Sequence, residues 1–369
     1  MIMKKLTSYC SLNMGQSPDS KTYNTNGEGM PFYQGNADFG VIHPVTRVWC
    51  SQPVKKAKKG DILISVRAPI GAMNIANEDC CIGRGLAALT PFAETSTEFL
   101  YYAVQSRVDS LIAQGTGSTF KAISKKVLEE TLLPSFSKKE QVDIIRKLGL
   151  VDSAIAERQK QLDLLKQLVK SRFIEMFIGQ GYPTKTIDEV SLVKGEYGAQ
   201  SASVEYDPSR PRYVRITDIN DDGTLNDDFV SSINPIDDEQ YRLEYGDFMF
   251  ARMGATVGKT YAFIEGNQIF AGYLIRYKLN QEIINPRYLY WYTRLDEYWN
   301  WVKLNQSGAA QPGINAKKYG SLQVPVPPME LQEQFAAFVK QTDKSKFEIQ
   351  KSLDELEILK KSLMQQYFG

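Results

Sequence analysis

The sequence predicts an α+β protein in which two globular modules alternate with two long helices. Two observations support this fold class: blocks of the 369-residue chain recur 186 to 191 residues apart, and a segment with a helical apolar period closes each copy. A chain of this length also exceeds one ordinary compact core, so two or three domains are expected. The predicted order is a module at 1–137, a helix at 138–180, a module at 181–328 and a helix at 329–369.

The recurring blocks justify the two modules. The stretch GDILISVRAPIG from Gly60 returns as GDFMFARMGATVG from Gly246, and the glycine loop GTGSTFKAI returns as SGAAQPGIN. Short β-rich runs such as DILISV, RYVRIT and DFMFA are separated by Gly- and Asn-rich turns, which is typical of mixed modules. A proline and then a Glu-Gln pair, at Glu140 and again at Glu333, precede each long segment. Because the blocks keep their order, they indicate two copies of one fold.

Each long segment carries apolar residues at alternating steps of four and three, which predicts a helix. A helix of about 40 residues is about 60 Å long, and its narrow apolar stripe favours a partner helix over the side of a globule. We therefore expect an antiparallel coiled coil about an approximate two-fold axis; packing of each helix on its own module is the alternative. The apolar seam positions are Ile144, Leu148, Val151, Ile155, Leu162, Leu165, Val169, Ile349, Leu353, Leu356 and Leu363. Four cations interrupt the seam and are expected to specify its register: Arg158, Arg172, Lys346 and Lys360.

The composition excludes several classes of function. No apolar run approaches the roughly 18 residues of a membrane span, and the N-terminus lacks a signal-peptide pattern, so we expect a cytoplasmic protein. A single histidine, His43, and four cysteines without CxxC spacing argue against histidine-based catalysis and a zinc site. The sequence contains neither a P-loop nor an Asn/Asp-Pro-Pro-aromatic tetrapeptide. We therefore predict a non-catalytic chain without a cofactor or metal of its own; a hydrolase or transferase with an unrecognised site is a lesser alternative.

Basic clusters point to nucleic acid. Residues 1–180 carry 23 Lys+Arg against 17 Asp+Glu, whereas residues 181–369 carry 21 against 26. Loop lysines can contact phosphates, and arginine forks beside an aromatic ring can read guanine edges or clamp phosphates. The candidate DNA-binding residues are Lys55, Lys56, Lys58, Lys59, Lys121, Lys125, Lys126, Arg210, Arg212, Tyr213 and Arg215. Alternatively, KKAKK is a solvated charge run and RYVRIT a strand with a polar face, while the acidic NDDGTLNDD is interpreted as an exposed turn.

The ordered blocks resemble the specificity subunit of type I restriction-modification systems over nearly the whole chain. In the first module the resemblance lies in MGQSPDSKTYNTNGEGMPFYQGNADFG, GDILISVRAPIGAMNIA and CCIGRGLAAL; in the second it lies in PRYVRITDINDDG, YGDFMFARMGATVGK and QSGAAQPGIN. The entries LLPSFSKKEQ and VPVPPMELQEQ resemble the start of the family's conserved helical regions. The resemblance implies two target recognition domains at the ends of an antiparallel helical pair. Each would read one half of a bipartite, asymmetric double-stranded DNA target.

The same resemblance implies partners and cofactors outside this chain. Two modification (methyltransferase) subunits dock on the helices and use S-adenosylmethionine, and restriction subunits cut with ATP and Mg. The chain departs from the family by starting almost directly in its first recognition domain and by its acidic second half. The alternative of a different class is a helical scaffold with two protein- or ligand-binding modules and no DNA role. Salt-sensitive retention of DNA by the assembled complex separates the two.

Overall fold

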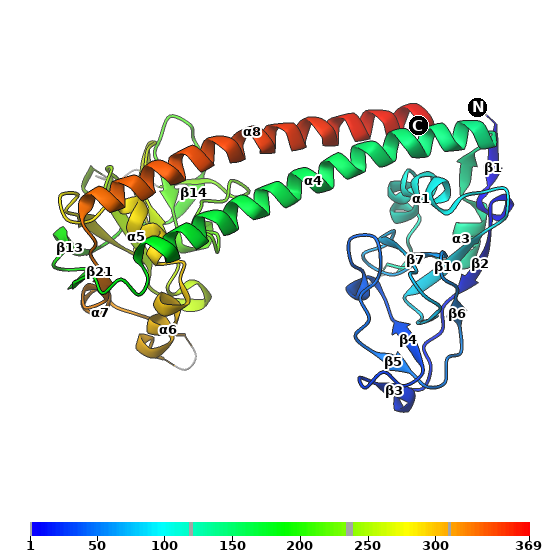
Figure 1. Cartoon of the computed structure of the whole chain (residues 1–369), viewed down its shortest axis with the longest axis horizontal. Helices are drawn as coiled ribbons and strands as arrows, with labels where there is room; N and C mark the ends of the chain where they lie inside the picture. The colour runs from blue at the N-terminus through cyan, green and yellow to red at the C-terminus, as the bar shows by residue number, and fades with distance from the viewer. Residues whose placement is uncertain (1, 118–120, 234–238, 309–310) are drawn as a thin grey trace. The chain divides into compact units, whose positions relative to one another are not determined.

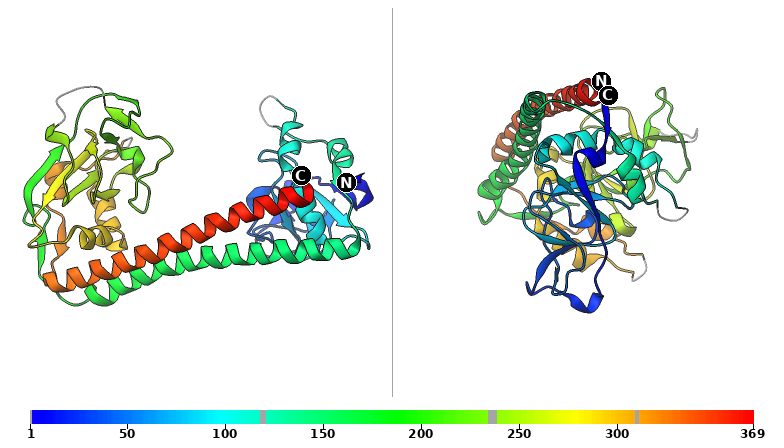
Figure 2. Two further views of the ribbon diagram at one scale, coloured as in Figure 1. Left: turned by 90° about the horizontal axis from the view of Figure 1, so that it is seen from above. Right: turned by 90° about the vertical axis from the view of Figure 1, so that its right-hand side faces the viewer.

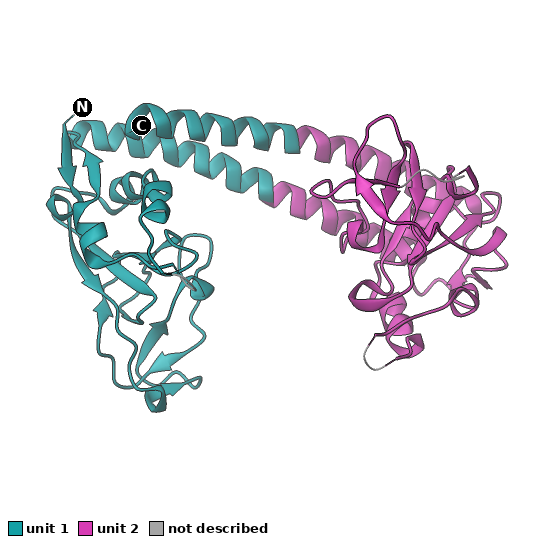
Figure 3. Ribbon diagram, turned by 180° about the vertical axis from the view of Figure 1, so that it is seen from behind, with its two compact units in different colours: residues 1–159, 350–369 teal, residues 160–349 magenta. Residues whose placement is uncertain are grey.

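The computed structural model divides the chain into two compact units, residues 1–159 with 350–369 and residues 160–349 (Figure 3). The structure describes residues 2–117, 121–233, 239–308 and 311–369 (Figure 1). Each unit holds one globular module and one half of each long helix. The units therefore divide the chain differently from the linear order of module, helix, module and helix, because each helix contributes its two halves to different units.

The first unit contains three sheets. β1 (Met3–Lys5) pairs with β11 (Leu132–Pro134), a four-stranded sheet has the order β2-β10-β7-β8, and a five-stranded sheet has the order β3-β5-β4-β9-β6. Their strands are β2 Cys10–Met14, β3 Tyr23–Asn24, β4 Met30–Tyr33, β5 Trp49–Cys50, β6 Lys56–Ala57, β7 Ile62–Ser65, β8 Met73–Ile75, β9 Cys80–Ile82 and β10 Leu86–Pro91. The short helices are α1 Thr97–Gln105, α2 Val108–Ala113 and α3 Lys125–Glu130, with 3-10 turns at Leu6–Ser8, Ser20–Thr22 and Asn36–Asp38.

The second unit repeats this topology, except that its second sheet has no counterpart of β6 among the described residues. β12 (Thr184–Thr186) pairs with β21 (Gln323–Pro325), and two four-stranded sheets have the orders β13-β20-β17-β18 and β14-β16-β15-β19. Their strands are β13 Ser191–Tyr197, β14 Ser203–Glu205, β15 Arg212–Val214, β16 Ser231–Ile233, β17 Asp247–Ala251, β18 Thr260–Ala262, β19 Gln268–Phe270 and β20 Leu274–Leu279. The helices are α5 Pro286–Tyr292, α6 Asp296–Asn305 and α7 Ala316–Gly320, with 3-10 turns at Ile216–Asp218, Glu239–Tyr241 and Gly254–Thr256. The prediction of an α+β tandem repeat is confirmed.

The central strand of each module is buried on both faces, which explains its continuous apolar sequence. In β7, Ile62 and Ile64 face the core that contains α1, whereas Leu63 faces the five-stranded sheet. In β17, Phe248 and Phe250 face the helices, whereas Met249 packs toward the second sheet. The period of two therefore divides each apolar run between two cores.

The glycine loops and the starts of the long helices recur because they make equivalent local hydrogen bonds in both copies. Ser124 and Asn315 are the N-caps of α3 and α7, where their side-chain oxygens accept backbone N–H bonds. At the start of the first long helix the buried Gln141 donates to the Phe136 carbonyl, and at the second Gln332 donates to the Pro327 carbonyl. The structural counterpart of Gln141 is thus Gln332, and the Glu333-Gln334 pair that resembled it in the sequence is exposed.

The two long helices are continuous over 40 residues each: α4 (Lys138–Phe177) and α8 (Met329–Phe368). Within the first unit they run antiparallel, since Lys147 contacts Tyr367, Asp152 contacts Lys360 and Arg158 contacts Ser352. Within each unit, Figures 1 and 2 show the two helical segments side by side. None of the helices in the described part of the chain is long and apolar enough to cross a bilayer.

The predicted seam agrees with the burial pattern except at its C-terminal end. The eleven apolar seam positions are all buried or half-buried. Arg172, however, is exposed and pairs with Glu175 at 2.8 Å, while the neighbouring Phe173 and Phe177 are buried. The prediction of Arg172 as a seam position is therefore wrong. From Val169 onward the buried side follows steps of four, because the helix here packs Phe173 and Phe177 against Tyr288 of module 2 as well as against Phe335 of α8.

Candidate nucleic-acid interface

In both modules the end of the central strand meets the glycine loop through the same backbone bonds. In module 1, Val66 N–H donates to Gly85 at 2.9 Å and the Val66 carbonyl accepts from Ile123 at 2.9 Å. In module 2, Arg252 N–H donates to Tyr273 at 3.0 Å and its carbonyl accepts from Ile314 at 2.9 Å. Each module therefore presents the same frame. We call this region the loop-end surface, formed in module 1 by Val66, Arg67, Arg84, Gly85 and Lys121 and in module 2 by Tyr197, Arg215, Arg252, Gly272 and Tyr273.

The loop-end surface of module 1 carries exposed cations. Arg67 and Lys121 lie on segments joined by the bond from Ala68 N–H to the Lys121 carbonyl, at 3.1 Å, and Arg84 precedes Gly85. Within the described part of the chain, no carboxylate lies within ion-pair distance of these three cations. Lys121 was predicted from the sequence, whereas neither arginine was. The signal for Arg67 was a single arginine inside the largely apolar recurring block GDILISVRAPIG.

The other lysine candidates lie away from this surface or have local roles. Lys125 begins α3 and pairs with Glu129 at 3.2 Å, and Lys126 beside it is exposed. The KKAKK segment forms β6, an edge strand of the five-stranded sheet, and lysines at a sheet edge discourage pairing with other chains. Lys56, Lys58 and Lys59 are exposed there, and Lys55 is half-buried. DNA contact by these lysines stays a prediction.

The clustered arginines of module 2 form ion pairs with carboxylates of the same module. Arg210 pairs with Asp207 at 3.4 Å, and Arg212 with Asp227 at 2.7 Å. Arg215 donates two hydrogen bonds to the Asp218 carboxylate, from Nη2 at 2.8 Å and from Nε at 3.2 Å. It also donates to the Phe229 carbonyl.

Tyr213 lies between these arginines in the sequence but is buried, and its hydroxyl donates to the Ala199 carbonyl at 2.7 Å. The side chains of Arg212 and Tyr213 therefore stabilise the module through hydrogen bonds to its own residues. Base readout by the RYVRIT segment stays a prediction, and within it Arg215 is the arginine that lines a cavity of the loop-end surface.

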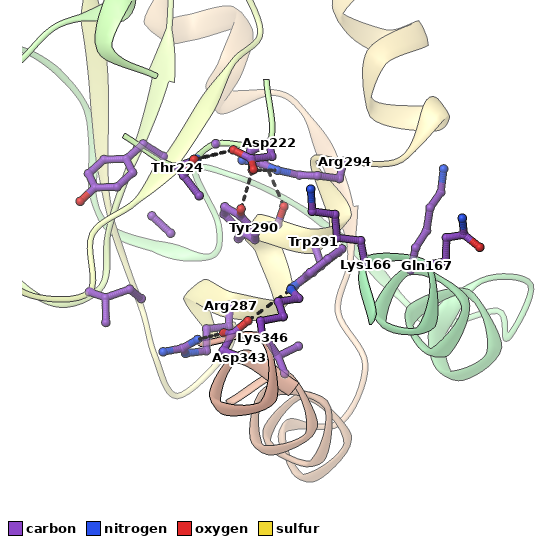
Figure 4. A pocket seen from close by; sticks show the side chains of 16 residues that line it. Lys166, Gln167, Asp222, Thr224, Arg287, Tyr290, Trp291, Arg294, Asp343 and Lys346 are labelled. Carbon is purple, nitrogen blue, oxygen red and sulfur yellow. Dashed lines mark hydrogen bonds and ion pairs between the residues drawn. The ribbon is translucent and has the colours of Figure 1, made fainter. Parts of the chain in front are cut away.

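The acidic NDDGTLNDD segment folds against the helices of the second unit (Figure 4). Lys259 pairs with Asp221 at 2.7 Å, and the Asp222 carbonyl accepts from Arg294 Nε at 2.9 Å and from the Tyr290 hydroxyl. Burial pushes the pKa of the Asp222 carboxyl upward, but hydrogen bonds from Thr224 and the nearby Lys166 and Arg294 outweigh it and leave that pKa below its ordinary value. The turn predicted from sequence is thus anchored by internal cations, which offset part of the negative charge of the second half.

This anchor borders a cavity of about 700 Å³ between module 2 and the helix segments of the same unit. Lys166 and Lys170 reach it from α4, and Asp343 and Lys346 from α8, where Asp343 lies 3.5 Å from Arg287 and 3.4 Å from Lys346 (Figure 4). Arg294 stacks on Tyr290, with its guanidinium carbon 3.9 Å from the ring centroid. The Arg294 guanidinium donates to oxygens of Thr260, Thr293, Tyr290 and Asp222. Because this arginine is used internally, we interpret the cavity as part of the packing between module 2 and the helices.

A second cavity, of about 650 Å³, opens at the loop-end surface of module 2. Arg252 lies at it with its guanidinium carbon 4.9 Å from the Tyr197 ring centroid and 5.5 Å from that of Tyr273. The lining also includes the polar side chains of Gln200, Ser201, Ser203, Arg215 and Thr217, and the apolar side chains of Ala199, Ile216 and Ala271. Among the described residues, no group of three or more His, Cys, Asp or Glu side chains could hold a metal ion. The arrangement suits hydrogen bonding and charge pairing with a polar polyanion.

Comparison with known proteins matches residues 2–167 and 181–358 to the type I restriction modification DNA specificity domain. A putative type I restriction enzyme MjaX specificity subunit from Methanocaldococcus jannaschii is 40% identical over 163 residues, which cover 44% of this chain and 38% of the relative. The MjaIX specificity subunit of the same organism is 23% identical over 245 residues, covering 58% and 57%. The chain thus spans less than two thirds of the length of either relative.

Two solved structures complete the comparison. The HsdS subunit from Thermoanaerobacter tengcongensis is 44% identical over 42% of this chain and 38% of that one, with a TM-score of 0.39. The type I restriction-modification S subunit from M. genitalium is 18% identical but aligns over 100% of this chain and 96% of its own, with a TM-score of 0.58. This second likeness supports the fold.

Proposed function

This chain belongs to the type I restriction-modification DNA specificity family, and on that premise we propose that it is the non-catalytic DNA-recognition chain of a type I complex. Module 1 and module 2 each read one half of a bipartite, asymmetric target. The observation that carries the proposal is the loop-end surface, where one backbone frame, repeated in both modules, presents different side chains. A repeated frame with different readers is what an asymmetric double-stranded target requires.

The cations of module 1 supply the sequence-independent part of binding. Arg67, Arg84 and Lys121 are exposed on neighbouring segments and are free of internal carboxylates in the described part of the chain. Neutralising phosphates with such side chains releases counterions and makes affinity fall with salt. A helical scaffold without a DNA role has no need of this arrangement, which favours DNA over the alternative.

The outer sides of the two long helices are the proposed docking surface for modification subunits. Large apolar side chains are exposed there, which is unusual unless a partner covers them. In the first unit they are Val142, Leu150, Ile358 and Leu359, and in the second Leu164, Leu168 and Phe347. In this proposal S-adenosylmethionine belongs to two docked modification subunits, and ATP and Mg belong to restriction subunits. This chain supplies recognition and spacing.

Mapping of methylated bases tests the proposal. DNA from cells that express this chain with its modification subunit is expected to carry methylation at one bipartite motif whose halves differ. The purified complex is expected to retain DNA with an affinity that falls steeply as salt rises. A continuous or palindromic motif contradicts the two-reader proposal, and salt-insensitive or absent DNA retention supports the scaffold.

The spacer is tested separately. Adding about four residues, one helical turn, to both α4 and α8 is expected to change the spacer length that is tolerated between the half-sites. The bases of each half-site are expected to stay the same, because neither module is altered. A change of half-site bases with an unchanged spacer contradicts the proposal that the helices set the distance.

A further inference from the structure

Arg252 is an arginine of module 2 whose terminal nitrogens are available to a ligand. Its Nε donates to the Gly272 carbonyl at 3.2 Å, and its guanidinium carbon lies over the rings of both Tyr197 and Tyr273. In the described part of the chain, Nη1 and Nη2 have no hydrogen-bond partner and no carboxylate lies within ion-pair distance. The neighbouring Arg212 and Arg215 are instead bound to Asp227 and Asp218. Arg252 thus offers a planar, two-pronged donor at the 650 Å³ cavity.

The flanking rings fix how this donor is presented. Tyr197 and Tyr273 are both exposed on one side, and the Tyr197 hydroxyl accepts the Ala316 N–H at 3.3 Å. Stacking on aromatic faces holds a guanidinium in one plane and lowers the entropy lost when it forms two parallel hydrogen bonds. Two parallel donors match the O6 and N7 acceptors of guanine in the major groove.

The same backbone position holds a different side chain in module 1. Val66 makes the two backbone bonds that Arg252 makes, and its side chain is buried. Strand register places Met14 opposite Ala87 and Tyr197 opposite Ile275, so Met14 and Gly85 occupy the places of Tyr197 and Tyr273. The whole Tyr-Arg-Tyr group is therefore absent from module 1, although the backbone bonds at this position are the same. A contact to phosphates common to both half-sites would not explain a group present in one module.

We propose that Arg252 is a specificity-determining residue of module 2 that donates Nη1 and Nη2 to a guanine in the half-site read by that module. Tyr197 and Tyr273 are positioning residues that hold its plane. The inference rests on the proposed function.

The test uses the complete chain assembled with its modification subunit and measures methylation across all sequence variants of the target. Arg252→Val, which copies module 1, is expected to remove the preference at one position of one half-site and to weaken binding of the original target about 5- to 150-fold. The other half-site is expected to be unchanged. Arg252→Lys keeps the charge and the stem but not the fork, and it is expected to relax the same position. Arg172→Ala, at an exposed arginine of α4 paired with Glu175, is the matched control and is expected to keep the motif.

The outcomes separate this inference from the proposed function. If both Arg252 variants weaken all targets equally, with a lower salt dependence, the side chain contacts phosphate and base reading by Arg252 is wrong. An unaltered motif in Arg252→Lys likewise overturns it. If the wild-type complex itself shows no bipartite motif, the proposed function fails, and this inference fails with it. Because Arg252→Lys preserves most of the packing, a folding defect in Arg252→Val leaves the test intact.

Discussion

The two modules share one strand order but use arginine differently. In module 1, Arg67 and Arg84 project into solvent at the loop-end surface, and Lys121 stands beside them. In module 2, Arg212 and Arg215 bond to Asp227 and Asp218 of their own module, whereas Arg252 has no carboxylate within ion-pair distance in the described part of the chain. The net charge of each half is therefore a poor guide to its DNA surface. In the acidic second half, carboxylates pair with arginines of the same module, while the terminal nitrogens of Arg252 stay available to a partner.

The modules also differ in which helix end completes their core. Phe368, next to the C-terminus, is buried in the first unit against Phe99 and Phe136. Phe173 and Phe177 of α4 fill the second unit against Tyr288 and Phe335. Module 1 therefore depends on the end of α8, which is distant from it in the sequence, whereas the end of α4 that fills the second core directly precedes module 2.

The largest expected effect is a core truncation confined to one unit. Phe173→Ala should destabilise the second unit, and Phe368→Ala the first, by about 3 to 5 kcal/mol each, because both rings are fully buried. Urea unfolding followed by two probes measures this: three of the four tryptophans lie in module 2, and all four cysteines lie in module 1. Phe347→Ala, at an exposed ring, is the control and should change stability by less than about 0.5 kcal/mol. Equal loss in both units from either change would contradict separate cores.

The cysteines of module 1 should be protected by burial. Desolvation raises the pKa of Cys10 and Cys80 to about 12 and that of Cys81 to about 11, from an ordinary 9.0. For Cys10 and Cys80 this lowers the thiolate fraction at pH 8 about a thousandfold, since each pKa unit is tenfold. Raised thiol pKa values mean that labelling of folded protein increases only as pH approaches 11 to 12. Alkylation rates at pH 8 should thus rise when the first unit unfolds, and rapid labelling of the native chain would be inconsistent with this core.

Replacing one arginine in each module should have opposite effects: one replacement should mainly lower stability, and the other should mainly weaken DNA binding. Arg215→Ala leaves the buried Asp218 carboxylate without its two-pronged partner and should destabilise the second unit by about 2 to 3 kcal/mol. Arg84→Ala, at an exposed side chain, should change stability by less than about 0.5 kcal/mol but weaken DNA binding. Thermal unfolding and DNA titration of the same two variants measure both quantities. A stable Arg215→Ala variant with relaxed specificity would restore the sequence-based interpretation of Arg215 as a base reader.

Sequence predicted best what depends on long periodic patterns. The helices, the tandem modules and the seam through Leu148 and Leu353 follow from spacing alone, since a repeated stripe needs only a partner surface. The seam prediction failed at Arg172, because there the helix packs on a module core as well as on its partner helix, and no local pattern specifies the position of that core. Within the candidate interface, Lys121 could be found from its loop, but the carboxylate partners of Arg212 come from residues 15 positions away. The recurring block already aligns Arg252 with Val66, but Tyr197 and Tyr273 come from distant parts of the sequence, so the group that they form with Arg252 appears only in the structure.

The smallest expected effect concerns Lys121, whose place in module 2 is taken by Pro312 in the equivalent loop. Because the lysine is exposed beside the glycine loop, Lys121→Ala should remove about one phosphate contact and lower the slope of log affinity against log salt by about 0.9. The loss should be the same for every target sequence, since a phosphate contact carries no base information. Lys138→Ala, at a lysine paired with Glu94, is the matched control and should leave the slope unchanged. A sequence-dependent loss in Lys121→Ala would make this loop a base reader in module 1, and an unchanged slope would move the phosphate contacts of module 1 to other cations.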